Sequence, residues 1–392
     1  MSNQILVKKE ILIKKPNLIK QVEMGFDVSN TDKSKSTKKY TFIDLFAGIG
    51  GFHYALHSQG FECVFASEID EKARITYQHN FKNISPQIFE GDGTPLFNKD
   101  ITKQDITKIP DHDILCGGFP CQPFSIAGHR KGFEDKGRGD LIFNIIEIIK
   151  QKQPRIVFLE NVKNLYNHDQ GQTCKYIKDL IEKQGYFVKE KVLNAGNFGL
   201  PTARERLYIL GFKNKRDFEK FEFPNIAYKP TKLLDFLEHE NKQTKNCEVV
   251  REDISFKTSK ITSDIFGNFP QKPLQIGKIN KGGQGERIYS PFGHAITLSA
   301  HGGGAAAKTG AYLINGKIRK LIPKECARIM GFPENFEIVV TPSQAYKQFG
   351  NSVTISVIKA ISTKIQFILN PQYIWQQNTQ QTLAQQLLEM AS

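Results

Sequence analysis

The chain has 392 residues, of which 39% are hydrophobic and 24% are charged, an ordinary balance for a globular protein with a large core. Lysine and arginine exceed aspartate and glutamate by 54 − 40 = 14, which suits a polyanionic partner such as nucleic acid, although solvated surface lysines would give the same excess. No apolar run approaches the roughly 18 residues of a membrane span, and no secretory signal pattern is present. Six cysteines without a CxxC pair predict neither a zinc site nor disulfides, as in a reducing cytoplasm.

Buried strands alternate with helices from residue 40 onward. Apolar runs predict strands, and apolar residues at helical spacing predict the helices between them. The expected strands are 40–46, 63–67, 113–116, 155–159 and 206–212, and the expected helices are 52–59, 71–80, 141–150 and 172–184. This alternation predicts an α/β fold with a mostly parallel sheet that is covered on both faces.

Composition divides the chain into five segments. Predicted strands and helices alternate up to Phe223-Pro224, where a polar region with short predicted strands begins. The alternation resumes near Ile322. The loosened region predicts a smaller, mainly β domain. The segments are a basic and flexible extension (1–39), the α/β domain (40–235), the smaller domain (236–322), a return to the α/β domain (323–370) and a glutamine-rich tail expected to form a solvated helix (371–392).

A glycine turn, Ala47-Gly-Ile-Gly-Gly51, follows the first strand. Glycines allow a ligand to approach the backbone, and the helix that follows offers free N–H groups. Glu68 lies 68 − 48 = 20 residues beyond Gly48, at the end of the second strand, which is the position of an acid that binds a ribose. These features predict a nucleoside-containing cofactor. A dinucleotide fits less well, because the turn reads GxGG instead of GxGxxG.

Three further patterns place candidate catalytic side chains at or near the ends of predicted strands. Cys121, in Gly117-Gly-Phe-Pro-Cys-Gln-Pro-Phe-Ser125, follows a buried strand, where open α/β sheets carry their sites. A lone cysteine is more often a small buried hydrophobe than a nucleophile. Glu160 follows the next strand, and alternation sends Arg204 and Arg206 to one face of another. Taken alone, the acid could be a helix cap and the arginines a surface pair.

Together these blocks resemble the DNA (cytosine-C5) methyltransferases. The matching blocks are FIDLFAGIGGF, GGFPCQPFS, ENV, RERLYILGF and QFGNSV, and they occur in this order between residues 40 and 361. The resemblance implies a Rossmann-like S-adenosylmethionine-dependent methyltransferase fold, with target recognition in the smaller domain. It extends to bacterial enzymes of type II restriction–modification systems. It therefore implies a monomeric cytoplasmic enzyme that modifies double-stranded DNA at GCGC or a related site, with a cognate restriction endonuclease as functional partner and no membrane association.

The resemblance also assigns catalytic roles. The Cys121 thiolate would add to C6 of a cytosine flipped out of the duplex, which activates C5 for methylation. Glu160 would hold the N3/N4 edge of the base, Arg206 would orient Glu160 and the base O2, and Arg204 would add positive potential near the thiol. Residues 121–139 would form the loop that closes on DNA.

For S-adenosyl-L-methionine, the resemblance implies a pocket of ten residues. The acid near adenine is ambiguous between Asp92 and Asp100, and the spacing to the Cys121 loop favours Asp100. Ile69 stands where relatives often have a tryptophan. The ten residues are Phe46, Gly48, Gly50, Glu68, Ile69, Asp100, Ile101, Pro120, Leu141 and Asn351.

DNA contacts are expected from the Cys121 loop and from two glycine-rich blocks of the smaller domain, residues 282–287 and 297–304. These blocks could otherwise be a pair of flexible hairpins. Arg287 can read guanine through N7 and O6, and Gln284 resembles the residue that fills the gap left by the flipped base. Thr202 departs from the family pattern, which usually shows glutamine there, and His301 stands where the GCGC-modifying member has a tyrosine. The predicted contacts are Gln122, Ser125, Arg138, Gln284, Arg287, Thr297, Ser299, His301, Gly303 and Gly304.

Three alternatives stay open at this point. The chain could methylate tRNA, as one branch of the family does, or it could be a catalytically silent DNA-binding relative. It could also be a small-molecule methyltransferase, for which the net charge of +14 and a second domain are unnecessary. No metal site is predicted.

Overall fold

The computed structural model describes residues 39–90, 96–120, 141–225, 228–257 and 270–370. Several predictions lie outside these residues: the flexible extension, the loop at 121–139 with its cysteine, and the helical tail. Asp92 lies outside them as well.

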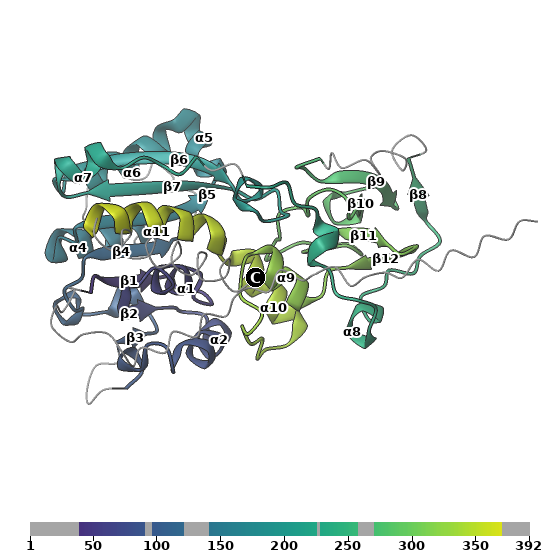
Figure 1. The fold of residues 1–392 in the computed structure, drawn as a ribbon, viewed down its shortest axis with the longest axis horizontal. Helices are drawn as coiled ribbons and strands as arrows, with labels where there is room; N and C mark the ends of the chain where they lie inside the picture. Colours follow the sequence, from purple (N-terminus) through teal and green to yellow (C-terminus); the bar gives the residue numbers. More distant parts are fainter. Residues whose placement is uncertain (1–38, 91–95, 121–140, 226–227, 258–269, 371–392) are drawn as a thin grey trace, which may run out of the picture. The chain divides into compact units, whose positions relative to one another are not determined.

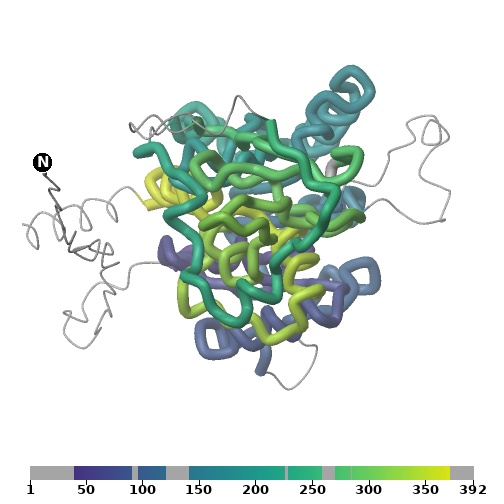
Figure 2. Tube along the Cα trace, turned by 90° about the vertical axis from the view of Figure 1, so that its right-hand side faces the viewer, coloured from purple at the N-terminus to yellow at the C-terminus, as the bar shows by residue number. Residues whose placement is uncertain are grey.

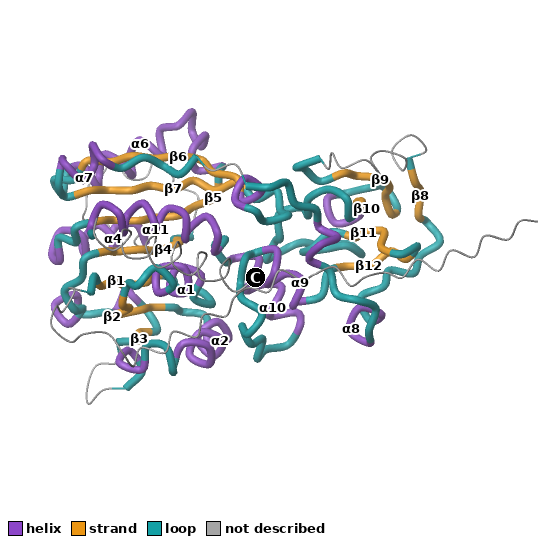
Figure 3. Tube along the Cα trace, viewed as in Figure 1, coloured by secondary structure: helices purple, strands orange, loops and turns teal. Residues whose placement is uncertain are grey.

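A seven-stranded sheet carries the larger part of the described chain (Figures 1 and 3). Its strand order is β3-β2-β1-β4-β5-β7-β6. The neighbours from β3 to β5 pair in parallel, whereas β7 runs antiparallel to both β5 and β6. The mostly parallel α/β sheet predicted from the sequence is thereby confirmed. The strands are β1 (Thr41–Leu45), β2 (Glu62–Ser67), β3 (Phe97–Asn98), β4 (Ile114–Gly118), β5 (Ile156–Val162), β6 (Phe187–Asn194) and β7 (Glu205–Phe212).

Apolar side chains on both faces of the sheet build two cores. Successive strand residues point to opposite faces, so Phe42 joins one core and its neighbour Ile43 joins the other. Residues of α1 (Gly51–His57), α2 (Glu71–Phe81) and α11 (Ile355–Leu369) complete the first core, and residues of α4 (Leu141–Lys152) and α6 (Gln172–Glu182) complete the second. Burial on both faces explains why the central strands are continuous apolar runs in the sequence.

The sequence patterns missed several elements. The edge strand β6 contains Lys189, Glu190 and Lys191 and is only partly buried, so it shows no apolar run. Some helices are also too short for the apolar spacing of a helix to repeat. These are α5 (Asn164–Asn167), α7 (Lys215–Lys220) and α8 (Lys242–Lys245), and the returning segment adds α9 (Pro323–Ile329) and α10 (Pro342–Asn351) before α11.

A second, five-stranded sheet lies within residues 254–320 and has the order β12-β11-β10-β9-β8 (Figures 1 and 2). A small core that includes Ile276, Ile279 and Ile288 supports it. This mainly β part agrees with the predicted architecture, while the boundaries 236 and 322 remain a prediction. Its strands are β8 (Ile254–Phe256), β9 (Leu274–Ile279), β10 (Arg287–Ser290), β11 (Ala311–Ile314) and β12 (Lys317–Lys320).

The stretch Pro342–Leu369 is long and apolar enough to span a membrane by length and composition, which the sequence analysis did not anticipate. It consists of two helices, α10 and α11, and 67% of its most apolar window is buried inside the molecule. Helix α11 packs beside α1 over the sheet (Figure 1). Its apolar character is therefore that of a core helix.

A buried carboxyl group lies in β1, below the glycine turn. The Asp44 side chain is fully buried, and it accepts a hydrogen bond from the backbone N–H of His53 in α1. Its Oδ2 has no hydrogen-bond partner among the described residues, and the Cys116 thiol lies 4.0 Å from Oδ1. Burial raises the pKa of Asp44 well above the usual range of a carboxyl group.

This raised pKa predicts a pH-dependent contribution to stability. The folded chain holds the Asp44 proton at a pH where the unfolded chain releases it, so stability falls as pH rises from the unfolded pKa toward the folded pKa. Asp44→Asn should therefore gain stability relative to wild type over that window, by up to about 1.4 kcal/mol per pH unit. Urea unfolding between pH 5 and pH 8 measures the difference. The exposed Asp111→Asn serves as control, and a constant offset for Asp44→Asn across this range would contradict the prediction.

Candidate active site

The first candidate residues lie where the chain leaves β1 and β4. These two strands are neighbours in the sheet, and the chain proceeds from β1 toward β2 on one side and from β4 toward β5 on the other. Open α/β sheets bind ligands outside the carboxyl ends of the strands at such a switch point. The glycine turn follows β1, and Phe119 and Pro120 follow β4 as the last described residues before Cys121.

The glycine turn has the backbone geometry of a ligand cradle. Phe46, Gly48 and Gly50 have φ values of 55°, 57° and 86°, in the left-handed region that glycine adopts without strain. A Cβ added to Gly48 would meet no atom of the described residues within 4 Å, so this part of the structure leaves the space beside Gly48 open. A Cβ on Gly50 would lie 2.1 Å from the Phe81 ring, so Gly50 is required for packing.

Glu68 holds the turn in place. Its carboxylate accepts hydrogen bonds from the backbone N–H of Gly48 at 2.8 Å and of Asp70 at 2.7 Å. Burial raises its pKa, while the two backbone hydrogen bonds lower it. Glu68 therefore connects the ends of β1 and β2, and the neighbouring Ile69 side chain is 71% exposed.

Asp100 lies beside this region because β3 pairs with β2, with Asn98 opposite Ser67. Its carboxylate accepts hydrogen bonds from the backbone N–H and the hydroxyl of Thr102, and the hydroxyl bond is the main cause of its lowered pKa. The following Ile101 is buried. Of the other predicted cofactor residues, Leu141 is half-buried at the start of α4, whereas Pro120 and Asn351 are exposed.

Glu160 is a buried member of the predicted catalytic residues. It lies inside β5, opposite Gly118 of β4, and is 7% exposed. An added Cβ on Gly118 would lie 3.3 Å from Glu160 Oε2, so the carboxyl group lies directly over that glycine. Asn161 also donates to the Phe119 carbonyl at 2.9 Å and ties the ends of β4 and β5 together. Cys121 would follow three residues after Gly118.

The two predicted arginines lie close to Glu160. Arg206 Nε lies 3.2 Å from Glu160 Oε1 as an ion pair, but this buried oxygen has no aligned hydrogen-bond partner among the described residues. Burial raises the pKa of Glu160, and the charges of Arg206 and Arg204 oppose the rise. Arg204 is 2% exposed, and burial lowers its pKa to about 9.

Of the predicted DNA contacts, Gln122, Ser125 and Arg138 lie outside the described residues, as does Cys121. The two glycine-rich blocks lie side by side, because Ala306 N–H donates to the Gly285 carbonyl and an added Cβ on Gly285 would lie 2.0 Å from the Gly303 oxygen. Arg287 is exposed at the start of β10, one residue after the 3₁₀ turn Gln284–Glu286. His301, Gly303 and Gly304 are exposed, whereas Thr297 and Ser299 are half-buried.

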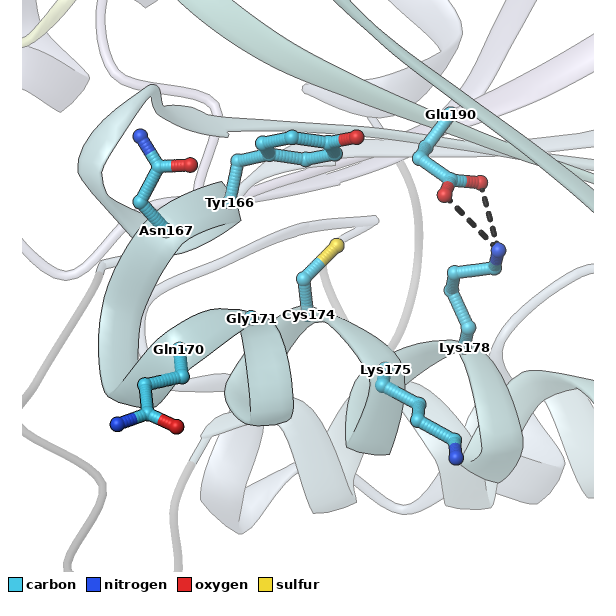
Figure 4. A pocket seen from close by; sticks show the side chains of 8 residues that line it. All are labelled: Tyr166, Asn167, Gln170, Gly171, Cys174, Lys175, Lys178 and Glu190. Carbon is cyan, nitrogen blue, oxygen red and sulfur yellow. Dashed lines mark hydrogen bonds and ion pairs between the residues drawn. The ribbon is translucent and has the colours of Figure 1, made fainter.

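A cavity of about 570 Å³ lies elsewhere, along α5, α6 and β6 (Figure 4). Tyr166, Cys174 and Lys175 contribute to its lining, and the Lys178 ammonium donates to Glu190 at 2.9 Å across one end. None of the predicted site residues lines this cavity among the described residues. It is therefore separate from the site at the ends of β1, β4 and β5.

The sequence analysis missed one contributor to the site. Val353, in the returning QFGNSV block, packs against both Gly51 and Gly118, since added Cβ atoms there would lie 2.6 Å and 3.6 Å from its methyl groups. It is 7% exposed. The block was predicted only to supply Asn351. A buried valine carries no signal of its own in the sequence.

Comparison with known proteins agrees with this geometry. A sequence model of the family described as C-5 cytosine-specific DNA methylase matches residues 40–367. The type II methyltransferase M.HhaI of Haemophilus parahaemolyticus is 47% identical over 86% of this chain and 98% of its own length. M.HpaII of Haemophilus parainfluenzae is 39% identical over 89% of this chain and 96% of its own length.

Solved structures agree at the level of the fold. The S. pombe Dnmt2 methyltransferase superposes with a TM-score of 0.60 at 20% identity, covering 85% of this chain and 99% of its own. A putative DNA modification methyltransferase encoded within a prophage of E. coli gives 0.59 at 21% identity, covering 85% and 100%. The family match and the two close relatives establish that the chain belongs to the C-5 cytosine-specific DNA methylases and is a DNA (cytosine-5) methyltransferase.

Proposed function

We propose that this enzyme methylates C5 of a cytosine that it extrudes from a GC-containing duplex site, GCGC or a related sequence, as the modifying half of a type II restriction–modification system. The observation that carries the proposal is the Glu160 carboxyl group, which is buried over Gly118 beside Arg206 and retains one oxygen without a hydrogen-bond partner among the described residues. A buried polar atom of this kind is costly unless a ligand satisfies it. The N3/N4 edge of an extruded cytosine has the donors and acceptors to do so.

Protonation of Glu160 fits this task. Burial raises its pKa, so the carboxyl group holds a proton more readily than an exposed glutamate does. A protonated carboxyl group can donate to N3 of the base as negative charge develops there. Arg206 keeps the carboxyl group in place through the 3.2 Å ion pair and has its own Nη1 bonded to the Glu205 carbonyl.

Cys121 supplies the nucleophile in this proposal, and its role rests on the sequence because it lies outside the described residues. Its thiolate forms a bond to C6, and the electrons of the C5–C6 double bond form a C4–C5 double bond. The electrons of the C4–N3 double bond move to N3, which takes the proton from Glu160. C5 then carries the electron density needed for methylation. After methylation N3 returns its proton to Glu160, and loss of the C5 proton to a base with expulsion of the thiolate from C6 restores the ring as 5-methylcytosine.

The residues around the glycine turn fit S-adenosylmethionine. The open space above Gly48, the acid Glu68 at the end of β2 and the exposed Ile69 side chain suit a nucleoside lying along the ends of β1 and β2. Asp100 would lie near the adenine. When bound, the cofactor supplies an electrophilic methyl group on a sulfonium centre.

Target recognition would use the two adjoining glycine-rich blocks. The exposed Arg287 has the geometry to bind a guanine edge from the start of β10. Backbone of the exposed 302–304 glycines can approach a DNA groove closely. The net charge of +14 supports attraction to duplex DNA. A cognate endonuclease, a monomeric state and a cytoplasmic location belong to the same proposal.

Two alternatives are less well supported. Methylation of tRNA would leave the GGQGER block at 282–287 without a purpose, and the close relatives are named type II methyltransferases. A silent DNA-binding relative would have no need for the Glu160 and Arg206 pair. A small-molecule methyltransferase is excluded by the family match.

The nucleophile can be tested by replacing its sulfur. Cys121→Ser should abolish C5 methylation, because a serine hydroxyl is not ionised at neutral pH, while affinity for the duplex stays within roughly threefold of wild type. Bisulfite sequencing of DNA from cells that express each variant measures methylation and also reports the site. The buried Cys174→Ser is the matched control and should methylate normally. Methylation by Cys121→Ser would refute the assignment.

The specificity role of Arg287 can be tested separately. Arg287→Ala removes the proposed bidentate contact to guanine and should cost about 1–3 kcal/mol of discrimination between the preferred site and a site with that base pair changed. Methylation rates on the two duplexes give the ratio. The exposed Arg251→Ala controls for loss of positive charge. An unchanged ratio for Arg287→Ala would assign the guanine contact to another residue.

A further inference from the structure

Arg204 has a position that its predicted catalytic role does not explain. Its guanidinium is buried and donates to three backbone carbonyls from two distant segments. Nη1 donates to Leu298 at 3.3 Å, and Nη2 donates to Gly350 at 3.1 Å and to Ser352 at 2.5 Å. A planar fork with several donors is the group best suited to join carbonyls that lie on different segments.

The first of these segments leads into the 297–304 loop, which is predicted to contact DNA. It also runs beside the residues that precede β7. Ala295 N–H donates to the Pro201 carbonyl at 2.7 Å, and Ala203 N–H returns a bond to the Ala295 carbonyl at 3.0 Å. The Thr297 hydroxyl donates to the Ala203 carbonyl at 2.5 Å. Ala295 and Thr297 are thus bonded directly to the residues that lead into β7, the strand that carries Arg206.

The second segment is the carboxyl end of α10, and it packs tightly on the same loop. An added Cβ on Gly350 would lie 2.4 Å from the nitrogen of Ala300 and 2.5 Å from the carbonyl carbon of Ser299. Real Cβ atoms do not approach backbone so closely, so the two backbones are in contact. Arg204 lies at the junction of this contact, two residues before Arg206, which pairs with Glu160.

We propose that Arg204 is a positioning residue: its guanidinium fixes the 297–304 loop relative to Arg206 and Glu160, so that methylation depends on correct seating of the recognised sequence. This inference rests on the proposed role of that loop in DNA recognition. The clamp consists of Arg204, the Leu298 carbonyl and the contact of Gly350 with Ser299 and Ala300. Displacing the loop should affect the choice between sites more strongly than it affects cofactor affinity, even though Arg204 also bonds the carbonyls on either side of Asn351, a predicted cofactor residue.

The test separates geometry from charge. Arg204→Lys keeps the positive charge, but a single ammonium group cannot span carbonyls on both segments. Gly350→Ala leaves Arg204 unchanged and pushes the Ser299–Ala300 backbone away. For both variants, the ratio of methylation rates on the preferred duplex and on a duplex with one changed base pair should fall about tenfold or more. Arg204→Lys loses charge-assisted hydrogen bonds, and Gly350→Ala loses the packing that these bonds stabilise. Affinity for S-adenosylhomocysteine should fall by a smaller factor than the discrimination between the two duplexes. The exposed Arg251→Lys is the matched control.

A second readout does not depend on activity. Amide hydrogen exchange in residues 295–300, which includes the Ala295 bond to Pro201 and the Ser299 bond to Lys308, should be faster in Arg204→Lys than in wild type or Arg251→Lys. Wild-type discrimination and wild-type exchange in Arg204→Lys would overturn the clamp and favour a purely electrostatic role. Failure of the proposed function would appear in the wild-type protein as absent C5 methylation, whereas failure of the clamp appears only in the variants.

Discussion

The proposed reaction depends on the position of one buried carboxyl group, that of Glu160. Glu160 lies in β5, and its neighbours on both sides are fixed by strand register: Gly118 faces it from β4, and Arg206 lies near it in β7. A side chain at position 118 would press on the carboxyl group, and no other described group satisfies its Oε1. The sheet thus presents a buried carboxyl group whose Oε1 pairs with Arg206 but has no aligned hydrogen-bond partner among the described residues, as the proposed contact with a base requires.

Sheet topology brings the remaining functions to this point. The glycine turn after β1 and the Phe119–Pro120 exit from β4 lie side by side because these strands pair in parallel. A cofactor at the turn would therefore lie at the same edge of the sheet as Glu160. The returning chain closes the arrangement. Val353 packs on Gly51 and Gly118, and Gly350 packs on the loop of the smaller domain. The proposed sites for cofactor, base and recognised sequence are thereby connected by packing contacts of the returning chain.

The central strands and the residues at their ends could be predicted from the sequence, because burial on both faces leaves a clear pattern. Central strands such as β1 and β4 are buried on both faces, so their apolar runs are unmistakable, and the blocks around Glu68 and Glu160 follow directly after such runs. The edge strand β6 was missed because it is only partly buried and its polar residues interrupt any apolar run. The alternation rule placed Arg204 and Arg206 together. It did not reveal that Arg204 bonds three carbonyls, because those partners lie about 94 to 148 residues away in the chain.

The most direct test of the account is a duplex that carries 5-fluorocytosine at the methylated position. Fluorine cannot leave C5 as a proton does, so the enzyme should remain covalently attached in the presence of S-adenosylmethionine. Peptide mapping of the adduct should identify Cys121, and Glu160→Gln should form it at least roughly 100-fold more slowly. An adduct at another residue, or an adduct formed by Glu160→Gln at the wild-type rate, would contradict the account.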